Sequence, residues 1–428
     1  MMDHNCYNEI IALIKREVIP AIGCTEPIAV ALAVAKAKEV LGKTPESISV
    51  YLSPNMLKNA MGVGIPSTDR TGLPIAVALG VVVGKSTYGL EVLKDSTADK
   101  VNEAIYYMDH HVIDILLKKG NIDKLYIEVE AKFGSESALV VIEKLHTNFT
   151  HISKNGVEQK ILHIEEEDVY KEEKPSLKLN MRLVYDFAME VPLADAAFIL
   201  EAGRLNKSAA EISLKGHYGH GLGSLLHTHT NMMGNNVLSK TLSYTSAACD
   251  ARMAGAMIPV MSNSGSGNQG ISATLPVVVY AEETKASEES LIRALILSHL
   301  TVIYIKQSLG RLSALCGCVV AATGSSCGIT YLMGGKYEQV SYAVQNMIAN
   351  ITGMICDGAK PSCSLKVTTG VSTALLSAMM AIENKCVSSI EGIIDEDVDK
   401  TILNLTRIGC EGMSKTDELV LDIMINKC

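Results

Sequence analysis

Three cysteines in the last third of the chain, Cys316, Cys356 and Cys363, each lie among glycine, serine and alanine residues. A fourth, Cys24, lies in the turn-like sequence Ile-Gly-Cys-Thr-Glu-Pro. Thiolates that come together from distant parts of one chain can hold an iron-sulfur cluster. Three protein ligands for four irons would leave one iron open to a substrate, so the residue types point to a lyase with an exposed Lewis-acid iron.

The spacing of these cysteines alone favours ordinary buried thiols. Cys356 and Cys363 flank a loop with Gly and Pro, which can turn both sulfurs toward one point, but Cys316 must come from another helix end. This set lacks the compact Cys-x-x-Cys spacing of zinc ribbons and bacterial ferredoxins. Six further cysteines have the default interpretation of small buried hydrophobic residues: Cys6, Cys249, Cys327, Cys386, Cys410 and Cys428.

Cys24 is predicted to lie just before the N-terminus of a helix that covers residues 27–41. Thr25 is the expected N-cap, and Pro27 suits an early helical position. Free backbone N–H groups and the helix dipole stabilise negative charge at such a terminus. We therefore expect the helix to lower the pKa of the Cys24 thiol.

A polar loop at residues 261–270 lies between two uncharged stretches. Its three glycines, among Ser, Asn and Gln, permit backbone N–H groups to converge on an anion such as a carboxylate. It has no Gly-Lys-Ser/Thr ending, so the loop does not indicate nucleoside triphosphate binding. The alternative is a plain linker, but linkers rarely lie between long apolar helical stretches inside a domain.

Two further segments could bind a carboxylate. Asn59 lies in a glycine-containing segment, residues 53–66, whose Asn residues could equally cap a helix. Arg252 is a lone basic residue at the start of an uncharged stretch. It either binds a carboxylate through two guanidinium N–H groups or forms an ion pair with Asp250, and the ion pair is slightly favoured.

Four histidines resemble a metal site, but they lie in a Gly/Ser/Thr-rich segment without a His-Glu-x-x-His helix, which disfavours zinc. They are His217, His220, His227 and His229. No lysine lies in a setting typical of pyridoxal phosphate, so an amino-acid lyase would need another electron sink.

The elements that must position these residues divide into two parts. Strand-like alternation occurs at residues 47–52, 124–129 and 138–145, with a hairpin partner at 151–164 that turns at Asn155-Gly156. Helical periodicity covers residues 7–18, 74–83 and 98–118. These patterns predict an α+β domain over residues 1–175, with a small, mostly antiparallel sheet and helices.

Strand patterns are scarce beyond residue 175. Helical periodicity covers residues 183–189, 194–205, 289–308, 337–354, 370–383 and 395–408. The charged segment 165–174 has the composition of an exposed connector between domains. We therefore predict an α-helical bundle over residues 176–428, which carries the three late cysteines, whereas Cys24 belongs to the first domain.

The composition excludes several classes of function. The net charge of −9 and the lack of a basic cluster disfavour a nucleic-acid partner. The uncharged stretches 253–281 and 312–335 are interrupted by Ser, Asn, Gly and Thr, so we expect no membrane-spanning helix. The first residues lack a secretion pattern and eleven cysteines favour a reducing compartment, so a cytoplasmic location is expected.

Six motifs resemble those of the L-cysteine desulfidase family and its relatives, whose helical half is similar to the alpha chain of iron-sulfur L-serine dehydratases. The resemblance spans nearly the whole chain. The motifs are Gly-Cys24-Thr-Glu-Pro, Ser53-Pro-Asn-Met-Leu-Lys-Asn, Asp250-Ala-Arg-Met, Ser262-Asn-Ser-Gly-Ser-Gly-Asn-Gln-Gly, Arg311-Leu-Ser-Ala-Leu-Cys316 and Met354-Ile-Cys356-Asp-Gly-Ala-Lys-Pro-Ser-Cys363.

The resemblance implies a 4Fe-4S cluster held by Cys316, Cys356 and Cys363, with Cys24 as the proton acceptor. Cys318, two residues from Cys316, is an alternative ligand, and Cys24 is either a base or an additional ligand. The implied reaction is β-elimination of hydrogen sulfide from L-cysteine, with pyruvate and ammonia as the final products.

The alternatives are an L-serine dehydratase with the same cluster and a non-catalytic, cluster-bearing sensor. The expected partner is a small amino-acid substrate, and a homodimer is the oligomer under consideration. From the loop and its neighbours we predict a set of substrate-binding residues: Asn59, Arg252, Ser264, Gly265, Ser266, Gly267 and Asn268.

Overall fold

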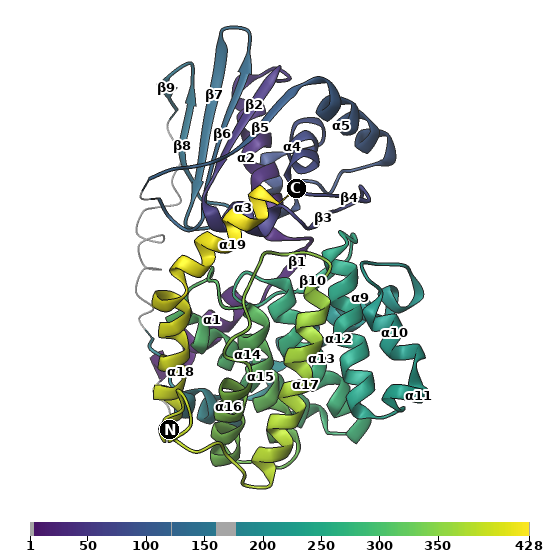
Figure 1. Ribbon diagram of the computed structural model, residues 1–428, viewed down its shortest axis with the longest axis vertical. Coiled ribbons are helices and arrows are strands. Elements are labelled where there is room, and N and C mark those ends of the chain that lie inside the picture. The colour runs from purple at the N-terminus through teal and green to yellow at the C-terminus, as the bar shows by residue number, and fades with distance from the viewer. Residues whose placement is uncertain (1–3, 121, 160–176, 428) are drawn as a thin grey trace.

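The computed structural model describes residues 4–120, 122–159 and 177–427. Figure 1 shows a part built on a β-sheet above a larger part built of helices. The predicted α+β class is confirmed, with helices dominating the C-terminal half. The predicted connector at 165–174 lies outside the described residues.

The principal sheet has six strands in the order β5-β2-β6-β7-β8-β9, and every neighbouring pair is antiparallel except β2 and β5. Alternate residues of β2 are buried, as expected for a sheet with one covered face. The strands are β2 (Ser47–Leu52), β5 (Val112–Leu117), β6 (Tyr126–Phe133), β7 (Glu136–Glu143), β8 (Phe149–Lys154) and β9 (Val157–Glu158). The predicted turn at Asn155-Gly156 joins β8 to β9, and both residues have positive φ.

Helix α2 (Thr25–Leu41) packs on this sheet, mainly against β6 and β7, and α4 (Leu73–Val82) packs against α2. Most of α2 is buried, because its own Ala and Val side chains make the helix apolar on all sides. The sheet part also contains α3 (Pro54–Ala60), β3 (Gly64–Ile65), β4 (Arg70–Thr71), η1 (Ser86–Glu91) and α5 (Ala98–His110).

The helix predicted over residues 98–118 is wrong in its second half. Helix α5 ends at His110, His111 is extended, and Val112 begins strand β5. The sequence Val-Ile-Asp-Ile-Leu-Leu is rich in β-branched residues, and the chain here pairs in parallel with β2 over six residues. This long-range pairing overrides the local helical pattern.

The helical part is a bundle around α13, α14 and α15, whose long uncharged surfaces pack together. A Cβ on Gly324 of α15 would lie 2.4 Å from the Ser298 carbonyl oxygen of α14, so a small residue permits this close approach. Its helices are α7 (Met181–Glu190), α8 (Leu193–Ala196), η2 (Ala197–Ile199), α9 (Leu200–Lys215), α10 (Leu222–Thr228), α11 (Thr230–Met233), α12 (Val237–Met253), α13 (Gly267–Thr284), α14 (Glu288–Leu309), α15 (Gly317–Leu332), α16 (Tyr337–Ile351), α17 (Cys363–Ile382), α18 (Val398–Arg407), η3 (Ile408–Gly412) and α19 (Ser414–Asn426).

Both ends of the chain connect the two parts. Helix α1 (His4–Glu17) contributes Ile10 and Ile14 to the core of the helical part. Strand β1 (Pro20–Ile22) pairs with β10 (Pro259–Met261), directly before the polar loop. At the other end, α19 packs against α3 of the sheet part. Figure 1 shows α19 rising from the helical part toward the sheet.

Among the described residues, one helix, α17, is long and apolar enough to cross a membrane. Half of its apolar stretch is buried inside the protein, where the helix packs against α12, α15 and α16. The core helix of a globular protein passes the same test, so this helix is weak evidence for a membrane segment. The stretches at 253–281 and 312–335 include α13 and α15, which are mostly buried.

Candidate active site

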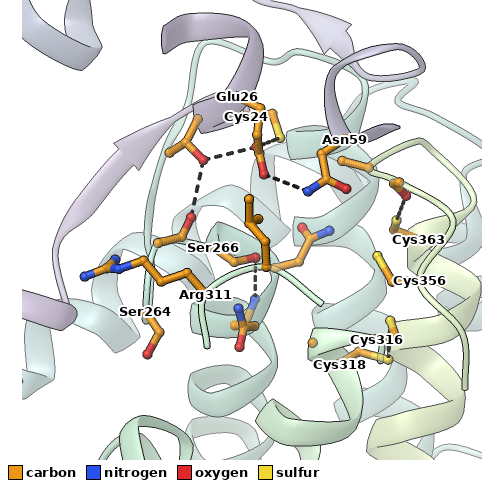
Figure 2. Close-up of a pocket in the computed structure, with 18 of the residues that line it drawn as sticks. Cys24, Glu26, Asn59, Ser264, Ser266, Arg311, Cys316, Cys318, Cys356 and Cys363 are labelled. Atoms are coloured by element: carbon orange, nitrogen blue, oxygen red, sulfur yellow. Dashed lines mark hydrogen bonds between the residues drawn. The ribbon is translucent and has the colours of Figure 1, made fainter. Parts of the chain in front are cut away.

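A pocket of about 120 Å³ lies where loops of the sheet part meet the helical part. The predicted site residues lie around this pocket, with Gly267 directly beneath Arg252. Those that line it are Cys24, Asn59, Arg252, Ser264, Gly265, Ser266, Asn268, Cys316, Cys356 and Cys363. Figure 2 shows the late cysteines along one wall, with Cys24, Glu26 and Asn59 above them. Residues more than 330 positions apart in the sequence therefore share one cavity.

The cysteine wall is built from two loops that pair with each other. The Cys316 amide donates to the Met354 carbonyl at 2.9 Å, and the Cys356 amide donates to the Ala314 carbonyl at 2.7 Å. This short bridge places Cys316, the N-cap of α15, beside Cys356. Cys363 is the first residue of α17. Cys316 and Cys363 therefore lie at helix starts, where free backbone N–H groups favour thiolates, whereas Cys356 lies in the loop before α17.

The three thiols influence one another electrostatically. The hydrogen bond between Cys316 and Cys318 lowers the pKa of Cys316 to about 7. Burial, followed by the negative charge of Cys316, raises the pKa of Cys356. Burial raises the pKa of Cys363 to about 11. A cation among them would favour the ionised form of all three, and thiolates suit soft metals such as zinc, copper(I) and the iron of iron-sulfur clusters.

The three cysteines supply the thiolate donors that an iron-sulfur cluster takes. In the described ranges, no three His, Cys, Asp or Glu side chains lie close enough together to hold one metal ion. A cluster spreads its irons and needs ligands that are farther apart. The same finding gives no support to zinc at the four histidines, among them His217 and His229.

Cys318 also lines the pocket, with its sulfur 3.5 Å from that of Cys316. Its thiol lies 3.1 Å from the Met354 sulfur and 3.3 Å from the Lys366 carbonyl oxygen, to which it donates. The hydrogen bond with Cys316, then burial, raises the pKa of Cys318 well above its ordinary value. The raised pKa and the donation to the Lys366 carbonyl therefore favour a protonated Cys318 thiol over a thiolate ligand.

Cys24 has a different environment from the one predicted. Cys24 itself, not Thr25, is the N-cap of α2, and it caps no backbone amide with its side chain. Its thiol donates to Glu26 Oε2 at 3.0 Å. Burial, then the Glu26 charge, raises the pKa of Cys24, although Arg252 opposes this. The expected lowering by the helix terminus is therefore wrong, because desolvation and a neighbouring anion outweigh the dipole.

The polar loop is more constrained than its glycines indicated. The amides of Ser264 and Ser266 donate to the carbonyls of Glu17 and Asn263. The amides of Gly267 and Asn268 lie in the first turn of α13, where no intrahelical acceptor exists, so they remain available. The end of the loop therefore retains the predicted capacity for an anion.

Arg252 is buried in the pocket wall without an anionic partner. Its Nη1 donates to Asn268 Oδ1 at 3.1 Å, and its Nε has no hydrogen-bond partner. In the described part of the chain, no carboxylate oxygen lies within 4.0 Å of the guanidinium, so the favoured ion pair with Asp250 is wrong. A Cβ on Gly267 would lie 2.2 Å from Arg252 Nε, so this glycine makes room for the guanidinium.

Sequence reasoning missed several lining residues. Glu26 accepts hydrogen bonds from Cys24, Thr25 and Asn59, although it stood in the same motif as Cys24. His146, from the loop after β7, and Gln269 each place a buried polar atom without a partner at the pocket. Burial lowers the pKa of His146, which favours a neutral ring. No pattern in the sequence singled out His146, whereas Gln269 lay within the polar loop but was not among the predicted binding residues.

Two cations form another wall of the pocket. Burial, then the charge of Arg311, lowers the pKa of Lys306 to about 8. The Lys306 ammonium donates to the Arg311 carbonyl at 2.9 Å, and the Arg311 guanidinium forms an ion pair with Glu17 at 3.0 Å. With Arg252, they make this side of the pocket favourable for anions.

Residues 87–422 match the family model described as serine dehydratase alpha chain. The chain belongs to the serine dehydratase alpha chain family. The match covers the cysteine wall, Arg252 and the polar loop, but begins after Cys24 and Asn59. The resemblance to iron-sulfur serine dehydratases is therefore confirmed at the level of the family. Membership of this family, which is associated with iron-sulfur clusters, indicates a lyase.

The chain also matches UPF0597 proteins over their full length. A UPF0597 protein of Bacteroides fragilis is 67% identical over 98% of this chain and 98% of its own. One from Parabacteroides distasonis is 61% identical over 100% of both chains. One from Oleidesulfovibrio alaskensis is 43% identical over 98% of both. The sheet part and Cys24 are therefore included in this wider likeness, which the family model covers only in part.

Proposed function

We propose that this serine dehydratase alpha chain relative eliminates hydrogen sulfide from L-cysteine. The products would be hydrogen sulfide and aminoacrylate, which tautomerises and hydrolyses to pyruvate and ammonia. The observation that carries the proposal is one pocket that brings the three late cysteines together with Cys24 from the other part of the chain. The coarser activity, that of a lyase, follows from the family.

Cys316, Cys356 and Cys363 would hold a 4Fe-4S cluster in this scheme. When bound, the cluster would supply a Lewis-acid iron toward the substrate carboxylate and the leaving sulfur. Lys366 supports the thiolates, because its charge contributes to the lowered pKa of Cys316 and opposes the rise that burial causes in the pKa of Cys356. This charge offsets part of the cost of holding three anions in a buried wall.

The remaining chemistry falls to side chains across the pocket. The Cα proton of the substrate passes to the Cys24 thiolate, the C–H electron pair forms the Cα=Cβ bond, and the Cβ–S bond breaks. The sulfur leaves with the electron pair of the broken Cβ–S bond and takes up a proton. Arg252 and the amides of Gly267 and Asn268 hold the carboxylate, so that the Cα proton faces Cys24.

An L-serine dehydratase is the second candidate, because the matching family model is described by that activity. The two reactions share the Cα proton, the carboxylate and the amine, and differ in whether sulfide or hydroxide leaves. A thiolate is the better leaving group because a thiol is far more acidic than an alcohol. Parallel assays with cysteine and serine decide between the two.

The test is anaerobic reconstitution with iron and sulfide, followed by assays of pyruvate and sulfide release. We expect broad visible absorption and faster turnover of L-cysteine than of L-serine. Cys356→Ser should lose both absorption and activity. Cys386→Ser, which changes a partly buried thiol bonded to Gln345 outside the pocket, is the matched control.

Three results would contradict the proposal. Activity that survives Cys356→Ser would remove this residue from the cluster. Faster turnover of serine would favour the second candidate. A cluster that forms while neither amino acid is consumed would support a non-catalytic sensor instead.

A further inference from the structure

We infer that Glu26 is the receptor for the α-ammonium group of the substrate and makes the pocket selective for zwitterionic α-amino acids. The inference deepens the proposed function and rests on it for the location of the substrate. It adds a specificity-determining residue that recognises the amine, whereas Arg252 faces the carboxylate.

Glu26 is a buried carboxylate without a cation. Its side chain is 8% exposed and accepts hydrogen bonds from three neutral donors, the Cys24 thiol at 3.0 Å, the Thr25 hydroxyl at 3.1 Å and the Asn59 amide at 3.2 Å. Within the described ranges, no Lys, Arg or His nitrogen lies within 4.0 Å of this carboxylate. A buried charge is costly unless it is paired, so this position is suited to a cation from outside the chain.

Arg252 presents the opposite charge in the same pocket. It is 3% exposed and has neither a carboxylate partner nor an acceptor for its Nε among the described residues. Glu26 and Arg252 are thus a buried anion and a buried cation at one pocket that do not neutralise each other by contact. An amino acid carries both complementary charges on neighbouring atoms, and therefore satisfies both side chains at once.

The neutral groups agree with this orientation. Asn59 donates to Glu26 through its nitrogen, which leaves its Oδ1 buried and without a partner beside the carboxylate. An ammonium has three N–H donors, and Glu26 and Asn59 offer it acceptors on adjacent side chains. The Cys24 thiol donates to Glu26 Oε2 at 3.0 Å and lines the same pocket as Arg252. Cys24 therefore lies near both charges, close to the Cα atom of a substrate held between them.

Calorimetric titration of the full-length reconstituted protein with L-alanine and L-lactate tests the inference. The two ligands share the carboxylate and the methyl group, and differ in an ammonium against a hydroxyl. We expect L-alanine to bind at least about tenfold more tightly, because hydrogen bonds to charged groups carry this difference. Equal binding of the two ligands, or binding of neither, overturns the inference.

Glu26→Gln identifies the residue responsible. The variant should bind L-alanine no more tightly than L-lactate and keep the wild-type affinity for lactate. Its melting temperature should be unchanged or higher, because the substitution removes an unpaired buried charge. Glu128→Gln, which removes a carboxylate bonded to Lys118 in the sheet outside the pocket, should retain the preference for alanine. A lower melting temperature with weaker binding of both ligands would indicate a structural role for Glu26 and overturn the inference.

The same variant separates this inference from the proposed function. If the protein eliminates neither sulfide nor water but still prefers alanine through Glu26, then only the proposed reaction fails. If it eliminates sulfide while Glu26→Gln keeps the preference for alanine, then only the amine receptor fails.

Discussion

Cys24 is buried beside a carboxylate, which is an unusual setting for a thiol base. Burial and the Glu26 charge raise the pKa of the Cys24 thiol, while the Arg252 charge lowers it. Removing a base at this position, as in Cys24→Ala, should lower kcat by about 10²- to 10⁴-fold. The visible absorption of the reconstituted protein should persist, because the three late cysteines remain. Loss of absorption in this variant would make Cys24 a ligand, and steady-state assays beside absorption spectra decide.

The pH dependence of the reaction follows from the raised pKa of Cys24. A base acts when deprotonated, so kcat/KM, which reports the free enzyme, should rise with pH through the neutral and mildly alkaline range. A bound ammonium offsets the Glu26 charge, and Cys24 then releases its proton to solvent more readily. The kcat profile should therefore level off at lower pH than the kcat/KM profile. Two flat profiles would exclude Cys24 as the base.

The sequence identified side chains by motif, and failed where contacts are long-range. Cys24 was singled out correctly as a pocket residue, but its partner Glu26 was passed over although it is two residues away. Glu26 and Asn59, which form a hydrogen bond, are 33 positions apart in the sequence. The motif around Cys24 therefore could not reveal that Cys24, Glu26 and Asn59 are connected by hydrogen bonds. His146 lies in an ordinary loop between strands, and only the folded chain places it at the pocket.

At the scale of elements, the start of α13 connects backbone shape to substrate binding. Glycine lowers the stability of a helix relative to alanine. By helix propensity alone, Gly267→Ala would therefore stabilise α13 by about 1 kcal/mol. The new Cβ would meet Arg252 Nε, however, and should displace the guanidinium. We expect KM to rise about tenfold or more, with a smaller change in kcat.

Gly203→Ala in α9 is a suitable control, because its Cβ would meet a Val278 methyl group at 3.1 Å away from the pocket. The control should keep the wild-type KM. An unchanged KM in Gly267→Ala would show that Arg252 does not need its observed position. Kinetics over a range of substrate concentrations provide the measurement.

The polar loop is supported by a buried histidine. Asn263 Nδ2 donates to His299 Nδ1 at 3.0 Å, so Nδ1 carries no proton and Nε2–H donates to Thr274. Burial lowers the pKa of His299 to about 3 from an ordinary 6.5. The unfolded chain therefore binds a proton that the folded chain does not, and stability rises with pH across this window.

His299 should contribute a slope of about 1.4 kcal/mol per pH unit between those two values. His299→Gln keeps an acceptor and a donor but cannot titrate, so its stability should depend less on pH. Urea unfolding of both proteins at several pH values measures the difference. Parallel curves for the two proteins would mean that His299 titrates normally in the folded state.

Element type was predictable wherever local pattern and tertiary contacts agree. The alternating strands and the long apolar helices were found because burial on one face or on all faces leaves a periodic pattern. The strand Val112–Leu117 was missed because its pairing with β2 lies more than 60 residues away. Helix α2 was found, but its N-cap was misplaced by one residue, the usual uncertainty of helix ends.

At the scale of the whole molecule, the class of fold followed from composition and periodicity, but the way in which the two parts meet did not. The C-terminal helix α19 returns to the sheet part, where Asp417 pairs with the buried Lys58 of α3 and accepts from Asn55 at 2.6 Å. Gly358, in the loop between Cys356 and Cys363, lies directly against the Lys58 carbonyl. The Lys58–Asp417 ion pair therefore supports the position of α3, and through Gly358 also that of the cysteine wall.

Asp417→Ala should destabilise the protein strongly. Lys58 is 1% exposed, so the substitution leaves an unpaired ammonium in the interior, at a cost of about 3 kcal/mol. The double variant Lys58→Met/Asp417→Leu removes both charges and should recover most of this loss, because apolar residues can replace a buried ion pair. Urea unfolding of the three proteins measures the difference. A mild effect of Asp417→Ala, equal to that of the double variant, would mean that water reaches Lys58 and that α19 is not held to the sheet part by this pair.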